Sequence, residues 1–414
     1  MSHNSCDSPQ VELIGFEKAL QTMLEYAQGV CGTEQVELAQ ALDRILAQDL
    51  TSPMDVPPAS NSAMDGYAIR TQDVNPQQQT RLKVTQRIPA GSTGQPLQAG
   101  SAARIFTGAP VPQHCDAVII QEQVQQDGEH IRFDAVVNHG QHIRQTGEDI
   151  RRGQVILKQG TRLRAQELGL AASIGISHLD VFRRVKVGIF FTGDELVEPG
   201  KALSQGQIYN SNRYTLTGLL HTLGCEIVDL GIVADTLQLT EQAILKAAEQ
   251  ADLVITSGGA SVGEEDHVCT ALKNQGQLYM WKLDVKPGKP VIFGRVKEAA
   301  FIGLPGNPVS MFAGFTQLAA PFIKKLQGLG KLLPRSFLVK AAFDRLETDS
   351  RREFARARLI ADEEGQFCAE IYHNQSSGVL MSATWADGFV VIPGNTPIHQ
   401  GDKIEYISFS EILE

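Results

Sequence analysis

Cysteine is sparse in this chain and follows no recognisable pattern. The six cysteines are scattered over 414 residues, without a CxxC pair or a Cys/His spacing. A disulfide framework is therefore not expected in a chain of this size, and neither is a zinc or iron–sulfur site. Reduced thiols, buried or at the surface, are the ordinary state of such cysteines in a cytosol.

Long hydrophobic runs and an excess of positive charge are also missing. No apolar stretch approaches the roughly 18 residues of a membrane span. The N-terminal sequence MSHNSCDSPQ is polar and lacks the apolar centre of a signal peptide. The formal charge of −10 argues against nucleic acid as the main partner, because binding to a duplex needs a basic face. We expect a cytoplasmic protein that binds neither membrane nor nucleic acid.

The chain is too long for one hydrophobic core. At about 100–200 residues per domain, the length predicts roughly two to four domains. We predict a multidomain protein that combines an α/β domain with β domains. Residues 10–50 and 142–184 form a helical, partly extended linker domain, and a small β-rich domain, residues 51–141, is inserted into it. A central, mostly parallel α/β sheet domain covers residues 185–328, and a β-barrel-like C-terminal domain covers residues 329–414.

Hydrophobic spacing and turn residues support this division. Apolar residues three and four positions apart predict helices within residues 14–50, including one at 38–46. We expect these helices to pack on each other or at a dimer seam. With residues 153–177 they are expected to form one unit. In the inserted domain, glycine-separated runs predict strands at 82–88, 103–106, 117–121 and 130–133. The α/β domain alternates strands near 227–230, 253–256, 279–283 and 301–304 with helices at 213–222, 237–251, 266–274 and 309–326. The last predicted strands are 337–343, 353–360, 367–372, 388–392 and 403–407.

Three apolar runs of the α/β domain end in polar loops that contain glycine. These loops are Gly193-Asp194-Glu195, the stretch from Ser257-Gly258-Gly259 to Asp266, and Pro305-Gly306-Asn307-Pro308. A strand, a glycine loop and a helix in succession form a cleft at the carboxyl ends of the strands of an α/β sheet. Backbone N–H groups at such glycines, and the N-termini of the helices that follow, favour an oxyanion.

The same loops carry carboxylates, notably Glu195 and Asp266. Carboxylates beside an anion site are explained if a divalent cation lies between them and a phosphate. The sequence therefore predicts a site for a phosphorylated or oxyanionic ligand with a metal. Each loop also has a simpler explanation: Asp266 as a helix N-cap, Glu195 in a solvated turn, and the two prolines as stiffening of a loop.

Two groups of cations are candidates for contact with an oxyanion. Lys282, Lys286 and Lys289 lie beside Pro287-Gly288, close in sequence to the expected cleft. In the C-terminal domain, one face of a predicted strand carries Arg352, Phe354, Arg356 and Arg358. For both groups, an ordinary solvated surface is the alternative.

Taken together, the motifs are similar to those of one family. In chain order they are NSAMDGYA (61–68), TGAPVP (107–112), GEDI (147–150), TGDEL (192–196), GQIYNSN (206–212), SGGASVGEEDH (257–267), KPGKP (286–290) and LPGNPVS (304–310). In this set and order the chain resembles the molybdenum-insertion enzymes of molybdenum-cofactor synthesis, the molybdopterin molybdenumtransferases, which are related to the C-terminal domain of gephyrin. Ala260 stands where the family usually has valine.

The resemblance implies an elongated homodimer of four-part chains, with an α/β domain similar to molybdopterin adenylyltransferase. It implies that adenylated molybdopterin and molybdate are the substrates, that Mg²⁺ is required, and that AMP leaves as molybdenum cofactor forms. Molybdopterin adenylyltransferase and the apo-molybdoenzymes are the implied candidate partners.

The resemblance also assigns residues by motif position. It places Asp65 and Thr107, from the second domain of the other subunit, in one catalytic site with Glu195, Asp235 and Asp266. From the chemistry of these carboxylates, our hypothesis is that Glu195 and Asp266 are the metal ligands and organise Mg²⁺. With the residues of the glycine loops, the predicted substrate-binding residues are Ser257, Gly258, Gly259, Lys282, Lys286, Pro305, Gly306, Asn307, Pro308, Arg144 and Asp149. A family serine falls near Ser376-Ser377, where the register is open.

Two other functions stay open at the level of sequence. An adenylyltransferase of the same pathway shares the Ser-Gly-Gly loop, but it lacks the NSAMDGYA domain and the C-terminal β domain; an adenylylation assay with ATP separates the two. A gephyrin-like scaffold that clusters receptors uses an additional linker and a trimerising domain, for which the sequence gives no sign.

Overall fold

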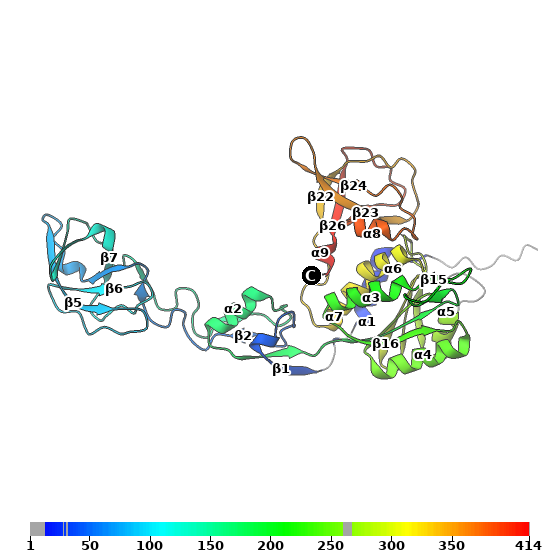
Figure 1. Ribbon diagram of the computed structural model, residues 1–414, viewed down its shortest axis with the longest axis horizontal. Coiled ribbons are helices and arrows are strands. Elements are labelled where there is room, and N and C mark those ends of the chain that lie inside the picture. Colours follow the sequence, from blue (N-terminus) through cyan, green and yellow to red (C-terminus); the bar gives the residue numbers. More distant parts are fainter. Residues whose placement is uncertain (1–12, 28, 30–31, 260–266, 414) are drawn as a thin grey trace, which may run out of the picture.

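The computed structural model describes residues 13–27, 29, 32–259 and 267–413. The chain is elongated, with the inserted domain at one end, the linker domain in the middle, and the α/β and C-terminal domains side by side at the other end (Figure 1). Within these ranges, no helix has both the length and the apolar character that a membrane span requires.

A six-stranded sheet forms the centre of the α/β domain. Its strands, in spatial order, are β16 (Glu226–Val233), β13 (Lys186–Thr192), β17 (Leu253–Ser257), β21 (Ala299–Leu304), β20 (Ile292–Val296) and β18 (Gln277–Trp281). The first four are parallel and the last two add on antiparallel. Strand β17 is buried along its whole length, as expected for a parallel strand that is covered on both faces. The expected strands are present, whereas β20 was not foreseen.

Helices cover both faces of this sheet. One face carries α1 (Phe16–Tyr26), α3 (Ser211–Thr222) and a continuous helical run made of α6 (Pro308–Gly314), the π-helical turn η4 (Phe315–Ala319) and α7 (Ala320–Leu326). The other face carries α4 (Leu237–Gln250) and α5 (His267–Gln275). Alternation along β13 separates the two cores, because Ile189 and Phe191 belong to the first and Phe190 to the second.

The linker domain corrects two expectations. The helix predicted at 38–46 is wrong: β1 (Thr33–Glu37) leads into a short 3-10 turn, η1 (Leu38–Gln40), and Asp43 has a φ of 61°, which an α-helix does not allow. Isolated bridges then join Ile45 to Arg162 and Leu46 to Val181. The prediction that the first helix packs with 153–177 is also wrong, because Ala19 and Met23 of α1 lie in the core of the α/β domain.

Short pairings complete the linker domain. Strand β1 pairs with β12 (His178–Phe182), and β2 (Leu50–Thr51) pairs with β11 (Val155–Leu157). Helix α2 (Ala165–Ser173) lies in the stretch 153–177, which was expected to belong to this unit.

The inserted domain is built on a second six-stranded sheet. Its spatial order is β7 (Ala117–Ile120), β4 (Gly66–Ile69), β6 (Ser101–Ile105), β5 (Thr80–Ile88), β9 (His130–Phe133) and β8 (Gln125–Asp127). A separate pair, β3 (Asn61–Ser62) with β10 (Ile143–Arg144), and two 3-10 turns, η2 (Thr71–Asp73) and η3 (Gln121–Gln123), accompany it. All the strands predicted for this domain are present.

The C-terminal domain is a closed five-stranded barrel. Its strands are β22 (Phe337–Ala341), β23 (Arg352–Ala361), β24 (Phe367–Ile371), β25 (Gly388–Ile392) and β26 (Lys403–Ser408), with the short helices α8 (Met381–Trp385) and α9 (Phe409–Leu413). The ring closes because β22 pairs with both β24 and β26, and β23 pairs with both β24 and β25. Strand β19 (Val285–Lys286), from the α/β domain, adds to β23 in parallel and links the two domains.

Candidate active site

A cavity of about 390 Å³ opens at the carboxyl ends of β13, β17 and β21. This is the edge where a doubly covered parallel sheet binds ligands, because the loops that leave neighbouring strands meet there. A short parallel pair, β14 (Leu196–Val197) with β15 (Ile208–Tyr209), contributes to the wall. The volume lies within the roughly 300–1,000 Å³ of small-molecule sites.

The structure brings together most of the residues predicted for this cleft. The predicted residues that line it are Glu195, Asp235, Ser257, Gly258, Gly259, Pro305, Gly306, Asn307 and Pro308. The three glycine loops therefore converge, as the strand-loop-helix pattern predicted. Asp266 lies outside the described residues, so its catalytic and metal-binding roles stay predictions.

Glycine is required where the second loop leaves its strand. Gly258 has a φ of 105°, and a Cβ built there would lie 2.2 Å from the Thr192 carbonyl oxygen at the end of β13. At Gly259, a Cβ would lie 2.6 Å from a methyl group of Val268 in α5. Only glycine permits this close approach of backbone to neighbour, so the loop sits deep between its two flanking elements.

Two buried asparagines form part of the wall, and no role was predicted for them although they belong to the GQIYNSN motif. Asn210 caps α3 by accepting a hydrogen bond from the Arg213 N–H. The Asn212 side-chain amide donates to the Ser257 hydroxyl at 2.8 Å and to the Gly306 carbonyl at 2.7 Å. The signal available in the sequence was the pair of amides in GQIYNSN, at the start of a predicted helix.

Two carboxylates of the lining are the candidates for a metal. Asp235 accepts a hydrogen bond from the Thr192 hydroxyl at 2.9 Å, and Glu195 follows the end of β13. In the described part of the chain, no three His, Cys, Asp or Glu side chains are grouped to hold an ion. Mg²⁺ commonly takes only one or two carboxylates together with substrate phosphates. The donor set therefore fits a phosphate-bridged Mg²⁺ rather than an ion held by protein alone.

Asp65 and Thr107 lie in the inserted domain, at the opposite end of the chain from the cleft (Figure 1). The Thr107 backbone N–H and hydroxyl both donate to Asp65 Oδ1, at 2.8 and 2.7 Å. These hydrogen bonds hold the pKa of Asp65 below its usual range. Arg144, on β10, pairs with Asn61 on β3. The Asp149 N–H donates to the Val56 carbonyl. None of these four predicted residues lines the cleft of its own chain.

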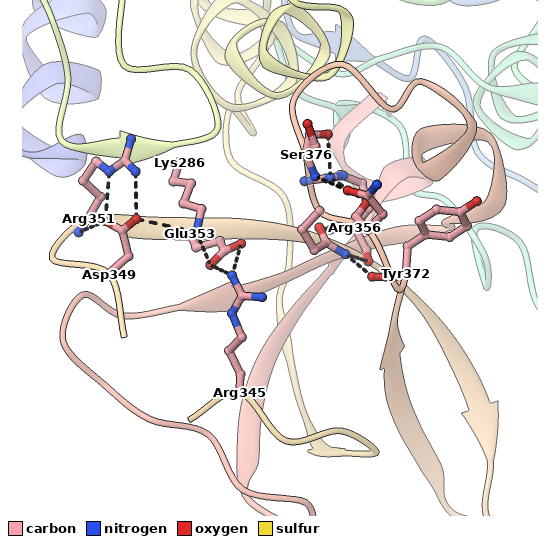
Figure 2. Close-up of polar contacts among 10 residues, drawn as sticks. Lys286, Arg345, Asp349, Arg351, Glu353, Arg356, Tyr372 and Ser376 are labelled. Atoms are coloured by element: carbon pink, nitrogen blue, oxygen red, sulfur yellow. Dashed lines mark hydrogen bonds and ion pairs between the residues drawn. The ribbon is translucent and has the colours of Figure 1, made fainter. Parts of the chain in front are cut away.

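Lys286 lies in a network of charges between the two domains. Its ammonium group is 3.5 Å from Asp349 and 3.4 Å from Glu353, which in turn accepts two hydrogen bonds from Arg345 (Figure 2). Arg351 binds Asp349 through two nitrogens and, with Lys286, holds the pKa of that carboxyl far below its usual range. The Lys282 ammonium lies over the Trp281 ring, 4.1 Å from its centroid. Neither lysine belongs to the lining of the cleft.

Arg356 is fully buried in the barrel, so for this residue the solvated-face interpretation is wrong. Its guanidinium donates to the Ser382 hydroxyl at 3.0 Å and to the Ser376 carbonyl at 3.2 Å, and Nη1 has no partner among the described residues (Figure 2). Burial lowers the pKa of Arg356 to about 10. The Val309 N–H donates to the Ser377 carbonyl at 3.0 Å, so the serine loop contacts the start of α6 beside the cleft.

Comparisons with known families cover almost the whole chain. Residues 14–175 match the MoeA N-terminal region (domain I and II), residues 188–325 a probable molybdopterin binding domain, and residues 339–409 the MoeA C-terminal region (domain IV). A molybdopterin molybdenumtransferase from Haemophilus influenzae is 41% identical, over 97% of this chain and 100% of its own length. Another from Nostoc sp. is 36% identical, over 90% of this chain and 88% of its own.

Solved structures agree with these matches. A molybdopterin biosynthesis MoeA protein from Pyrococcus horikoshii is 32% identical, with a TM-score of 0.80 over 96% of this chain and 99% of that chain. Another solved structure of a molybdopterin biosynthesis MoeA protein, from Pyrococcus horikoshii OT3, gives a TM-score of 0.83 at 28% identity, over 96% of this chain and 100% of that chain. The resemblance inferred from the motifs is thus confirmed, and so is the multidomain fold at the level of its architecture. The chain belongs to the MoeA family of molybdopterin molybdenumtransferases, enzymes of the transferase class with a role in molybdenum-cofactor biosynthesis.

Proposed function

We propose that this protein inserts molybdate into adenylated molybdopterin and releases AMP. The observation that carries the proposal is the convergence of three glycine loops and two carboxylates, Glu195 and Asp235, on one cleft in the domain that matches the molybdopterin-binding family. Backbone N–H groups at glycine loops suit phosphate oxygens, and the carboxylates suit the cation that accompanies a pyrophosphate.

The chemistry required is cleavage of the phosphoanhydride that joins AMP to molybdopterin. In such reactions, positioning and neutralisation of charge contribute most of the catalysis. We assign Glu195, with Asp266, to hold Mg²⁺ and orient the attacking oxygen. A bound Mg²⁺ would neutralise negative charge on the bridging phosphates. Asp235, held by the Thr192 hydroxyl, is fixed in orientation at the same edge.

Molybdate is a tetrahedral dianion, and we place its entry beside the junction of the cleft and the barrel. Two features support this location: the buried Arg356 keeps one nitrogen without a partner in the described chain, and its serine loop contacts the N–H of Val309 at the cleft. Lys286 is a positive charge at the junction of the α/β and C-terminal domains, but its ammonium group is already paired with Asp349 and Glu353. An oxyanion bound by Lys286 therefore has to compete with these carboxylates.

The decisive assay supplies the purified protein with adenylated molybdopterin, Mg²⁺ and molybdate, and measures AMP release together with reconstitution of an apo-molybdoenzyme. We expect AMP release that depends on molybdate, and expect Glu195→Gln and Asp266→Asn to abolish it with the fold intact. Glu226→Gln, at an exposed ion pair with Lys186 on the same sheet, is the matched control and should keep full activity. Full activity in both the Glu195 and the Asp266 variant would refute the assignment of these carboxylates. Bound nucleotide without AMP release would favour a scaffold, and adenylylation with ATP would favour the adenylyltransferase.

We further propose that Asp65 and Thr107 act in the cleft of a second copy of the chain in a homodimer. Their position at the far end of an elongated chain supports this, because one chain holds them away from its own cleft (Figure 1). The test is complementation between Asp65→Ala and Glu195→Gln chains, each inactive alone. In a randomly mixed two-fold dimer, about a quarter of the sites carry neither substitution, so activity should return to that level. No recovery after subunit exchange, with mixed dimers demonstrated by mass, would refute a shared site.

A further inference from the structure

A chain of hydrogen bonds connects two of the loops in the cleft through a helix. Asn212 lies in the first turn of α3 and is 9% exposed. Its amide nitrogen donates to the Ser257 hydroxyl at the end of β17 and to the Gly306 carbonyl after β21. The Ser257 hydroxyl donates in turn to the Pro305 carbonyl at 2.9 Å. One side chain of α3 thus holds the Ser-Gly-Gly loop and the Pro-Gly-Asn-Pro loop in a fixed relation.

The direction of these hydrogen bonds is determined by their partners. Carbonyl oxygens accept only, so the Asn212 nitrogen has to face Gly306 and the hydroxyl proton of Ser257 has to face Pro305. Ser257 Oγ therefore accepts from Asn212. The network has one arrangement rather than several, and both ends of it are buried.

We infer that Asn212 is a positioning residue, which sets the distance between the two loops that bind the substrate phosphates. The inference rests on the proposed function and extends it to a residue of α3. Asn212 Oδ1 is buried and accepts no hydrogen bond from the described residues. Both of the hydrogen bonds that Asn212 donates end on loops that line the cleft.

The experiment compares Asn212→Ala and Asn212→Asp with Asn274→Ala. Aspartate keeps the size of the side chain and its acceptor oxygens, but it has no N–H to donate and brings a negative charge toward the Gly306 carbonyl. Asn274 is an exposed asparagine on α5 that donates to Glu241 at 2.7 Å, so it serves as the matched control. For each protein, molybdate-dependent AMP release, the Kd of AMP by calorimetry, and the melting temperature are measured.

We expect both Asn212 variants to lower kcat for AMP release by about 100-fold, the effect of displacing reacting groups by roughly 1 Å. Because Asn212 acts through the loops, the Kd of AMP should weaken by much less, and Asn274→Ala should match the wild type. If Asn212→Asp keeps the wild-type rate, the donated hydrogen bonds do not matter and the inference is refuted. A loss of rate that disappears at a temperature where the variant is fully folded would refute it as well.

A second variant keeps the inference testable if Asn212 variants do not fold. Ser257→Ala alone removes the hydroxyl that accepts from Asn212 and donates to the Pro305 carbonyl, so it should lower kcat for AMP release with a much smaller change in the Kd of AMP. A wild-type rate in Ser257→Ala would overturn the inference. Where Asn212→Ala folds, the two defects should not add, because both changes break one network. Failure of the proposed function is a separate outcome, since the wild-type protein would then release no AMP in response to molybdate.

Discussion

Glu353 offers the sharpest test of how the barrel is joined to the α/β domain. It is 3% exposed and lies on β23, where its carboxylate accepts hydrogen bonds from Arg345 at 3.2 and 3.3 Å and contacts Lys286 at 3.4 Å. The perturbation is Glu353→Gln, which keeps the volume and removes the charge. Lys286 would keep Asp349 at 3.5 Å, whereas Arg345 would lose its carboxylate.

The magnitude follows from these distances. At about 3.3 Å and an effective dielectric constant of about 20, one such pair has a Coulomb energy of roughly 5 kcal/mol before desolvation is subtracted. Removing one partner of a buried pair typically costs about 3–5 kcal/mol. Side-chain exposures of 30% for Arg345 and 27% for Lys286 allow water to screen part of the loss. We therefore expect a decrease of about 3 kcal/mol in the free energy of unfolding of the barrel.

A chain of several domains need not unfold in one step, so the assay has to report the barrel alone. Trp385 lies in α8 of the barrel and Trp281 is the other tryptophan, so a Trp281→Phe background gives a local fluorescence probe for urea unfolding. Glu370→Gln is the control, because its pair with Arg358 is 2.8 Å long but exposed, and we expect a loss below about 1 kcal/mol. If Glu353→Gln costs no more than Glu370→Gln, the reasoning from burial is wrong.

Two further perturbations test the inserted domain and the cleft. Thr107→Val keeps the backbone N–H but removes the hydroxyl that binds Asp65, so the pKa of Asp65 should rise part of the way toward its ordinary value. Because that pKa is lowered by folding, the associated stabilisation is present above the unfolded value and is lost as pH falls through the folded one. In the variant the stabilisation should be smaller and its loss should be complete at a higher pH. Carboxyl ¹³C NMR measures the pKa of Asp65, and an unchanged pKa would contradict the assignment. Gly258→Ala places a Cβ 2.2 Å from the Thr192 carbonyl and should lower AMP release at least about 100-fold. Gly218→Ala, in α3 with nothing within 4 Å of its Cβ position, should leave AMP release unchanged, and equal rates in the two variants would contradict the close approach at Gly258.

The cleft could be predicted because its geometry is encoded locally. Each of its loops follows a buried strand and precedes a helix, and parallel neighbouring strands bring their carboxyl ends to one edge whatever the details of packing. Glu195, Ser257 and Pro305 were therefore placed correctly from short stretches of sequence. Asn212 was missed because an amide in the first turn of a helix has an ordinary local explanation, whereas its two acceptors lie far along the chain.

Long-range pairing accounts for the expectations that failed or shifted. The apolar spacing of residues 38–46 is helical, but the 3-10 turn η1, the positive φ of Asp43 and the bridges to Arg162 and Val181 break this stretch up. Lys286 is only a short way from the cleft in sequence, yet β19 pairs with β23 and turns it toward Asp349 and Glu353. Strand pairing of this kind depends on a partner that no local pattern specifies.

The hydrogen bonds of Asp65 have to be explained together with its separation from Glu195 in the same chain. The Thr107 N–H and hydroxyl lower the pKa of Asp65, a half-buried residue of the inserted domain, although an ordinary carboxylate is already ionised at neutral pH without such hydrogen bonds. Hydrogen bonds of this type fix the direction of a carboxylate more than they change its charge. A fixed orientation suits a carboxylate that a second group approaches, and the cleft of the same chain lies at the far end of the molecule (Figure 1). An oriented carboxylate that lies away from the cleft of its own chain supports the proposal of a site that two chains complete, which the complementation between Asp65→Ala and Glu195→Gln tests directly.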